Sequence, residues 1–156
     1  PVKAMLLECD GSRIGTLVDR HLAGLGGSSL RETLRDYADT NGVPNVVLMA
    51  SGSEVEIVLA AREKLAAGGV NARVVSCPSL ELFAQQDAAY RASILPAGVP
   101  RVAIEAGVTD GWWKYGCAAV VGIDSYGESA PAPELFKHFK LTAANLVGVV
   151  RKVVGR

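Results

Sequence analysis

Two acidic side chains are the first candidates for chemistry, because each lies near the end of an apolar run that reads as a strand. Glu105 closes the run 101–105, and Glu128 lies in a polar turn that follows the apolar run 118–123. Carboxylates at strand ends can act as a general acid and a general base. No histidine or nucleophile lies beside either of them in the sequence, so no complete catalytic constellation is predicted. The alternative role is structural, in which each carboxylate caps a helix or accepts hydrogen bonds from loop N–H groups.

The turn Ser51-Gly52-Ser53 is a second candidate, because it lies between a predicted strand and a predicted helix. Backbone N–H groups at such a junction can bind an anion, although the sequence lacks the Gly-Lys-Ser/Thr end of a Walker motif. The alternative is a tight turn with a serine cap. Ser51 has the capping-box spacing to Glu54, and Ser53 has the same spacing to Glu56. The helix could therefore begin at either serine.

A cluster of aromatic and basic residues after the third predicted strand is the third candidate. It consists of Trp112, Trp113, Lys114 and Tyr115. Aromatic rings at this place can stack on a ligand or anchor an interface. Adjacent helical residues cannot both face the core equally, so one tryptophan is predicted to be buried, and for the other both an interface and a core position stay open. Together with Glu105 and Glu128 at the same rim, the cluster is predicted to form an interdomain contact surface within residues 107–131.

The overall composition argues against two classes of partner. A chain of 156 residues fits one domain with a substantial core. Lys+Arg and Asp+Glu both number 16, so the chain lacks the basic footprint of a nucleic-acid-binding protein. No apolar stretch is long enough to span a bilayer, and the chain does not open on a signal-peptide pattern. We therefore expect neither a nucleic-acid nor a membrane partner.

Cysteine and histidine usage predicts no disulfide framework and no metal site. Cys9, Cys77 and Cys117 are odd in number and form no Cys-x-x-Cys pair, which favours reduced thiols in the cytoplasm. Cys77 has no neighbouring base and is predicted to be a buried structural thiol. His21 and His138 are far apart and lack the spacing of metal ligands.

The periodicity of apolar residues divides the chain near residue 42. Residues 1–42 are interpreted as an N-terminal segment, a linker or an edge strand, with residues 34–38 as the strand candidate. Strand-like and helix-like patterns alternate over residues 43–156, which predicts βαβ units and a parallel sheet covered by helices on both faces. The predicted strands are 46–50, 71–76, 101–105 and 118–123; the predicted helices begin near residues 53, 79, 87, 133 and 142, with a short one inside 107–115.

Several blocks of the sequence, in their order and spacing, closely resemble the C-terminal domain of transketolases. The blocks are Met49–Val55, Ala72–Ser76 with Pro78-Ser79, Gln86-Asp87 with Tyr90-Arg91 and Leu95-Pro96, Arg101–Gly107, Trp113–Tyr115 and Tyr126–Pro131. The resemblance runs from Val43 to the end of the chain. The sequence is shorter than the family pattern between Tyr115 and Ala118, and residues 1–33 do not resemble the pyrimidine-binding domain that precedes this one in the family.

The resemblance implies an α/β fold in three layers, α/β/α, with a mostly parallel five-stranded sheet and one antiparallel edge strand, which residues 34–38 would supply. The family it points to transfers a two-carbon ketol unit between sugar phosphates in the pentose phosphate pathway, as a cytoplasmic homodimer. In that family thiamine diphosphate and a divalent cation (Mg or Ca) bind in the two preceding domains. The resemblance therefore implies no catalytic, cofactor-binding or metal-binding residue in this chain, which would contact the other domains and a second subunit.

Two alternatives to a transketolase domain stay open at the level of sequence. One is the homologous domain of another thiamine-diphosphate enzyme, such as a deoxyxylulose-phosphate synthase or a 2-oxo-acid dehydrogenase component. The blocks Trp113–Tyr115 and Gly127–Pro131 favour transketolase over these relatives. The other alternative is an independent α/β module that binds an anion or a nucleotide at the Ser51–Glu54 turn.

Overall fold

The described part of the chain is a parallel sheet with helices on both faces. The computed structural model describes residues 43–155, and residues 1–42 and 156 lie outside that part. The four strands are β1 Val46–Ala50, β2 Ala72–Ser76, β3 Arg101–Ile104 and β4 Ala119–Val121, in the order β2-β1-β3-β4. All three strand pairings are parallel. This confirms the predicted α/β class, whereas the antiparallel strand predicted at 34–38 lies outside the described residues.

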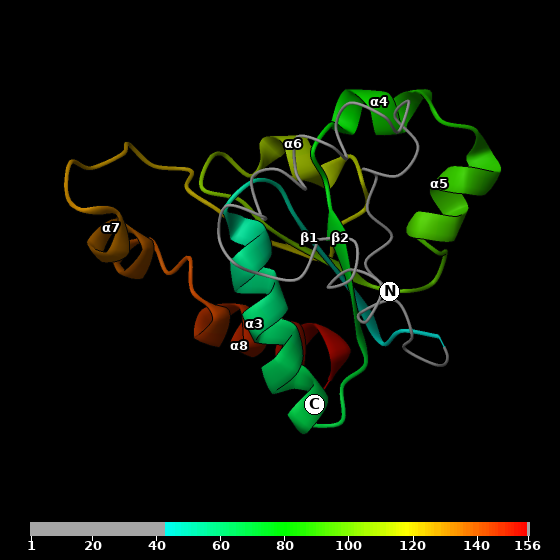
Figure 1. Ribbon diagram of the computed structural model, residues 1–156, viewed down its shortest axis with the longest axis horizontal. Coiled ribbons are helices and arrows are strands. Elements are labelled where there is room, and N and C mark those ends of the chain that lie inside the picture. The colour runs from blue at the N-terminus through cyan, green and yellow to red at the C-terminus, as the bar shows by residue number, and fades with distance from the viewer. Residues whose placement is uncertain (1–42, 156) are drawn as a thin grey trace, which may run out of the picture.

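Helices cover the sheet in two separate layers (Figure 1). The helix α3 Glu54–Ala67 lies beside α8 Ala143–Val154 on one face, where both pack on a core that includes Val58, Leu65 and Leu146. The other face carries α4 Leu80–Gln85, α5 Ala88–Ile94 and α6 Asp110–Trp113, over a core that includes Phe83 and Trp112. The remaining helix, α7 Ala132–His138, follows the last strand and leads into α8.

The central strand β1 is buried along its whole length, as its run of apolar residues predicts. A strand that is covered on both faces cannot alternate polar and apolar residues, because each side chain enters one of the two cores. Val46 and Leu48 pack in the α3–α8 core, and Val47 and Met49 pack in the other core. Alternate residues of one strand thus tie the two layers together.

The boundaries of the elements follow the predictions closely, with one clear difference at β4. The predicted strand 118–123 is reduced to Ala119–Val121. The Ile123 N–H bonds the Gly107 carbonyl at 2.7 Å, so the chain beyond β4 pairs with the loop after β3 and not with a strand. The residues directly after β4 therefore position the loop that follows β3.

The start of α3 differs from the predicted capping boxes. Ser53 is the N-cap residue, but its backbone is already helical and its side chain makes no capping bond. A capping hydroxyl normally belongs to an extended residue, from which it can reach the free N–H groups of the first turn. The hydroxyls of Ser51 and Ser53 instead donate to the carboxylates of Glu105 and Glu54. Both predicted capping boxes are wrong for this reason.

Candidate contact site at the carboxyl edge of the sheet

The carboxyl ends of β1 and β3 bring two predicted site residues together. From β1 the chain passes to β2 at the edge of the sheet, and it then returns to the other side of β1 to form β3. The carboxyl ends of two strands at such a reversal are the usual ligand position in open α/β sheets. Ser51 and Glu105 lie at this position, and the Ser51 hydroxyl donates to Glu105 Oε2 at 2.9 Å. The side-chain partner of Glu105 is thus a serine hydroxyl.

A second acidic residue, Glu54, lies at the same turn and was not among the predicted site residues. Its side chain is only 3% exposed, and its Oε1 accepts a hydrogen bond from the Ser53 hydroxyl at 2.9 Å. Gly52 forms the turn before it with a φ of +50°, a conformation that favours glycine. The signal that could have identified Glu54 in the sequence is its position in the first turn of a predicted helix, where the positive end of the helix dipole stabilises a carboxylate. With Glu54 and Glu105 both present, the charge around Ser51 and Ser53 disfavours an additional anion.

Hydrogen bonds that involve Val121, Asp124 and Trp113 hold the loop that follows Glu105. The Glu105 N–H bonds the Val121 carbonyl at 2.9 Å. Asp124 accepts from both the backbone N–H and the hydroxyl of Thr109, each at 2.8 Å. These two bonds hold the pKa of the Asp124 carboxyl below its ordinary value. The Trp113 indole N–H donates to the Thr109 hydroxyl at 3.2 Å, so Asp124, Thr109 and Trp113 form one chain of contacts.

The same loop requires a glycine at position 122. A Cβ built there would lie 2.7 Å from Thr109 Cγ2 and 2.8 Å from the Gly107 carbonyl oxygen. The second neighbour is backbone, which cannot move aside as a side chain can. Gly122 therefore allows the chain after β4 to approach the loop after β3 closely. We refer to residues 105–115, without the buried Trp112, and residues 122–131 together as the rim.

The two adjacent tryptophans divide as predicted, one inward and one outward. Trp112 is 3% exposed and packs edge-on against Tyr115, with ring centroids 6.5 Å apart. Trp113 is 49% exposed at the rim. Lys114 places Nζ 5.2 Å from the centroid of the Tyr115 ring, a cation–π contact. Their role as interface residues stays a prediction that the proposed function below takes up.

Other apolar side chains are exposed along the rim beside Trp113. Val108 is 66% exposed, and Tyr126 is 97% exposed in the loop before α7. Glu128 is also exposed in that loop and makes no hydrogen bond or ion pair with another residue of the described part. The described contacts thus give Glu105 a serine partner and do not join it to Glu128 as an acid–base pair.

The two described cysteines are buried in the core under α4–α6, in keeping with the prediction for Cys77. Burial is the main cause that raises the pKa of Cys77 to about 12, and the nearby Cys117 adds to it. Burial also raises the pKa of Cys117 to about 11. Across residues 43–155, no cluster of three or more His, Cys, Asp or Glu side chains is arranged to hold a metal ion. None of the described helices is both long and apolar enough to span a membrane.

Comparison with known proteins gives consistent relatives over this part of the chain. The family model described as the transketolase-like TK C-terminal domain matches residues 34–142. Transketolase 2 of Escherichia coli (strain K12) is 53% identical over 120 residues, which are 75% of this chain and 18% of the relative. Transketolase 2 of Pasteurella multocida (strain Pm70) is 48% identical over 124 residues, 78% of this chain and 19% of that protein.

Solved structures give the same result. The transketolase from Leishmania mexicana superposes with a TM-score of 0.69 at 44% identity, over 72% of this chain and 17% of that chain. The transketolase from Pichia stipitis in complex with sedoheptulose-7-phosphate superposes with a TM-score of 0.71 at 33% identity, over 83% of this chain and 19% of that one. The chain thus spans less than a fifth of the length of these relatives. By its ordered sequence blocks, its parallel sheet and the family match over residues 34–142, the chain belongs to the transketolase-like C-terminal domain family.

Proposed function

We propose that this chain is the C-terminal domain of a transketolase, and that within the complete enzyme it makes structural contacts with the other domains and a second subunit. The complete enzyme would be a cytoplasmic homodimer of the pentose phosphate pathway. It would transfer a two-carbon ketol unit between sugar phosphates, with thiamine diphosphate and a divalent cation bound outside this domain. Identities of 53% and 51% to the two Escherichia coli transketolases support the assignment.

The observation that carries the contact role is the rim. Trp113, Val108 and Tyr126 are exposed there, although large apolar side chains are usually buried. The Asp124–Thr109 bonds hold the Trp113 indole in one position. A large ring with its geometry already fixed loses little entropy on association, which suits an interface anchor.

The same geometry disfavours the independent anion-binding module as an alternative. The hydroxyls of Ser51 and Ser53 already donate to Glu105 and Glu54. A ligand anion would have to displace or approach two carboxylates at this turn. The proposed contact role needs no such displacement.

The test is a reconstitution from two pieces. This chain is mixed with a transketolase truncated before its C-terminal domain, with thiamine diphosphate and Mg²⁺ present. Complex formation is measured by sedimentation, and ketol transfer is measured by a coupled assay. We expect a complex between the two pieces and no turnover by this chain alone.

Two substitutions make the reconstitution specific to the rim. Trp113→Ala should weaken the complex by about 2 kcal/mol, which corresponds to about 30-fold in the dissociation constant. Val43→Ala is the matched control. Val43 is also an exposed apolar residue, but it precedes β1 and so lies at the amino ends of the strands, whereas the rim lies at their carboxyl ends. Equal affinities for Trp113→Ala and Val43→Ala would show that the rim is not the contact surface. Turnover by this chain alone would contradict the assignment of the active site to other domains.

A further inference from the structure

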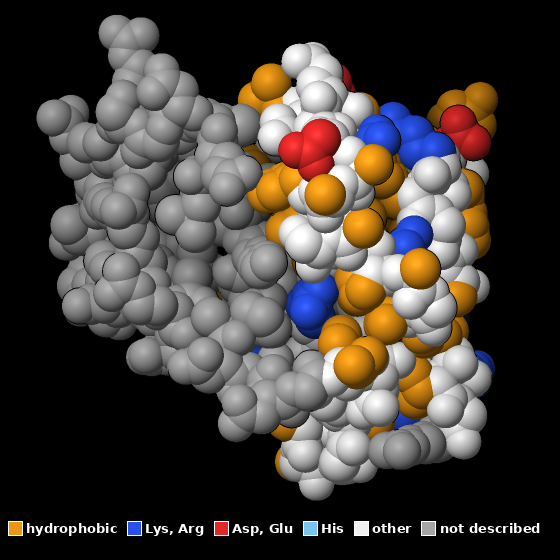
Figure 2. Space-filling model, turned by 90° about the vertical axis from the view of Figure 1, so that its right-hand side faces the viewer, with side chains coloured by type: hydrophobic (Ala, Val, Ile, Leu, Met, Phe, Trp, Pro, Cys, Tyr) orange, Lys and Arg blue, Asp and Glu red, His pale blue; other side chains and the backbone are white. Residues whose placement is uncertain are grey.

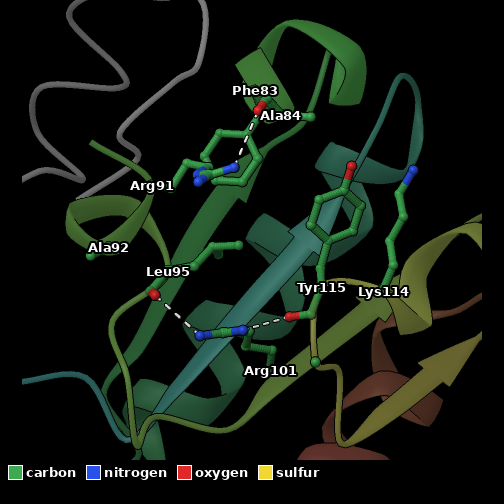
Figure 3. Close-up of a pocket in the computed structure, with 9 residues that line it drawn as sticks. Phe83, Ala84, Arg91, Ala92, Leu95, Arg101, Lys114 and Tyr115 are labelled. Carbon is green, nitrogen blue, oxygen red and sulfur yellow. Dashed lines mark hydrogen bonds between the residues drawn. The ribbon is translucent and has the colours of Figure 1, made fainter. Parts of the chain in front are cut away.

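We infer that the cavity bounded by α4, α5 and the end of α6 is a binding site for a small organic polyanion. The cavity holds about 570 Å³, within the range of small-molecule sites. Its walls carry the cations Arg91, Arg101 and Lys114, and none of its lining residues is acidic (Figure 3). The cavity is lined by neither Ser51 nor Glu105, and its charged lining residues are all basic.

Arg101 supplies a fixed positive charge at the base of the cavity. Its two Nη atoms donate to the carbonyls of Leu95, Pro96 and Tyr115. Carbonyl oxygens hold the guanidinium in place without neutralising it. Arg101 Nε is buried and has no hydrogen-bond partner in the described part of the chain. No carboxylate of residues 43–155 forms an ion pair with Arg101, so its charge acts on the cavity.

Arg91 and Lys114 are the two cations that can reach a ligand directly. Figure 3 shows them on opposite sides of the Tyr115 ring. Arg91 uses one N–H for the Ala84 carbonyl at 3.2 Å, which leaves further donors of its guanidinium. The Lys114 ammonium lies over the Tyr115 ring, and neither cation forms an ion pair with an acidic residue of the described part of the chain. Figure 2 shows basic side chains among hydrophobic ones on the face that carries α5, with acidic side chains beside them.

The charges that line the cavity favour a ligand with more than one negative charge. Three cations and no acidic residue among the lining residues give the cavity a positive potential, which attracts anions. Leu95 and Ala92 provide contact for a short carbon body between the charged groups. A planar base is disfavoured, because Lys114 covers the Tyr115 ring and Phe83 packs beside it at 6.1 Å. These features favour a short carbon chain with two anionic groups, and a chain that carries a phosphate and a carboxylate is one such ligand.

The probe for this site is 3-phosphoglycerate, which carries both anionic groups on three carbons. Binding to the purified protein is measured by calorimetry and NMR, with the ionic strength held constant by sodium chloride. We expect saturable one-to-one binding, with shifts at Ala92, Leu95 and Gly116. Arg91→Gln and Lys114→Gln should each weaken the affinity about tenfold, as loss of a hydrogen bond between charged groups predicts.

The matched controls are Arg151→Gln and Lys152→Gln, two exposed cations on α8 at the opposite face of the sheet. They should leave the affinity unchanged. Lys114 is exposed, so Lys114→Gln keeps the test valid even if Arg91→Gln lowers stability. Binding that does not saturate, or an equal loss in variants and controls, would overturn the proposal. Arg91 lies outside the rim. If Arg91→Gln lowers the affinity for the anion and leaves complex formation with the truncated transketolase unchanged, the anion site is distinct from the proposed contact surface.

Discussion

The interior of this domain and its rim are held together by different kinds of interaction. In the interior, strands and helices bury continuous apolar surface, as in the core around Leu65 and Leu146. At the rim, the loops after β3 and after β4 lie close together because Gly122 has no side chain, and hydrogen bonds from Thr109 to Asp124 join them. The free energy of burying apolar surface does not depend on the direction of the contacts. The strength of a hydrogen bond and the fit of a close backbone contact depend on distance and angle. The rim can thus present an exposed ring in a fixed position, while the interior supplies the stability.

The largest expected difference between the two regions is at the adjacent tryptophans. Trp112→Ala removes a side chain that is 3% exposed and should lower the free energy of unfolding by about 4 kcal/mol. Trp113→Ala removes a ring that is 49% exposed and should lower it by less than about 1 kcal/mol. Urea titration of both variants measures the difference. Equal destabilisation by the two substitutions would mean that the rim is packed as tightly as the interior.

A methyl group added at the rim tests its dependence on geometry. Gly122→Ala brings a Cβ to 2.8 Å from the Gly107 carbonyl oxygen, and we expect a loss of about 2 kcal/mol from the displaced loop. Gly111→Ala is the matched control, because a Cβ there meets nothing within 4 Å. The control should be neutral or slightly stabilising, since alanine restricts the unfolded chain more than glycine does. Thermal melts of both variants decide the point, and a neutral Gly122→Ala would remove the geometric argument for the rim.

Alkaline pH is expected to act on the interior through Cys77. The unfolded thiol titrates near its ordinary pKa of 9.0, whereas burial raises the pKa in the folded state to about 12. Below pH 9 both states keep the proton and the stability is complete. As the pH rises from about 9 toward about 12, only the unfolded chain loses the proton, so stability should fall by about 1 kcal/mol per pH unit.

Cys77→Ala should remove this part of the alkaline loss. Denaturant titrations of the wild type and the variant at a series of pH values measure it. Groups that titrate in both proteins cancel in the difference. Cys117→Ala should act over a narrower interval, because the pKa of Cys117 is raised only to about 11. A difference between wild type and Cys77→Ala that does not change with pH would show that the thiol is accessible to water in the folded state.

Acid pH is expected to give the smallest effect, and to act on the rim through Asp124. The hydrogen bonds from Thr109 lower the pKa of this carboxyl below its ordinary value of 3.8. Its contribution is therefore present above the unfolded pKa and is lost as the pH falls through the lower folded pKa. Asp124→Asn should lose this acid dependence and release the Trp113 indole. Tryptophan fluorescence of the wild type and Asp124→Asn, measured from neutral pH downward, checks both outcomes; identical profiles would exclude Asp124 as the residue that positions the ring.

The strands and most helices could be predicted because they depend on local pattern. The run Val46–Ala50 is continuously apolar, which identifies a strand covered on both faces, and the structure confirms it. Ser79, Asp87 and Thr142 cap their helices with side-chain bonds, at positions near which the sequence predicts these helices to begin. The failed caps at Ser51 and Ser53 have a physical reason. The carboxylates of Glu54, in the same helix, and of Glu105, directly after β3, compete for these hydroxyls, and only Glu54 is a sequence neighbour.

Sequence patterning and propensity by themselves determined the α/β class, the order of the strands along the chain and the split between the two tryptophans. These properties follow from the spacing of apolar residues, which each segment carries within itself. Only the tertiary structure decided that Glu105 meets Ser51, that Asp124 holds Thr109, and that Arg91, Arg101 and Lys114 surround one cavity. Those residues come from different elements and loops of the chain, and Ser51 and Glu105 are 54 residues apart. Their contacts depend on which strands become neighbours, and strand order in a sheet is set by the packing of the whole domain.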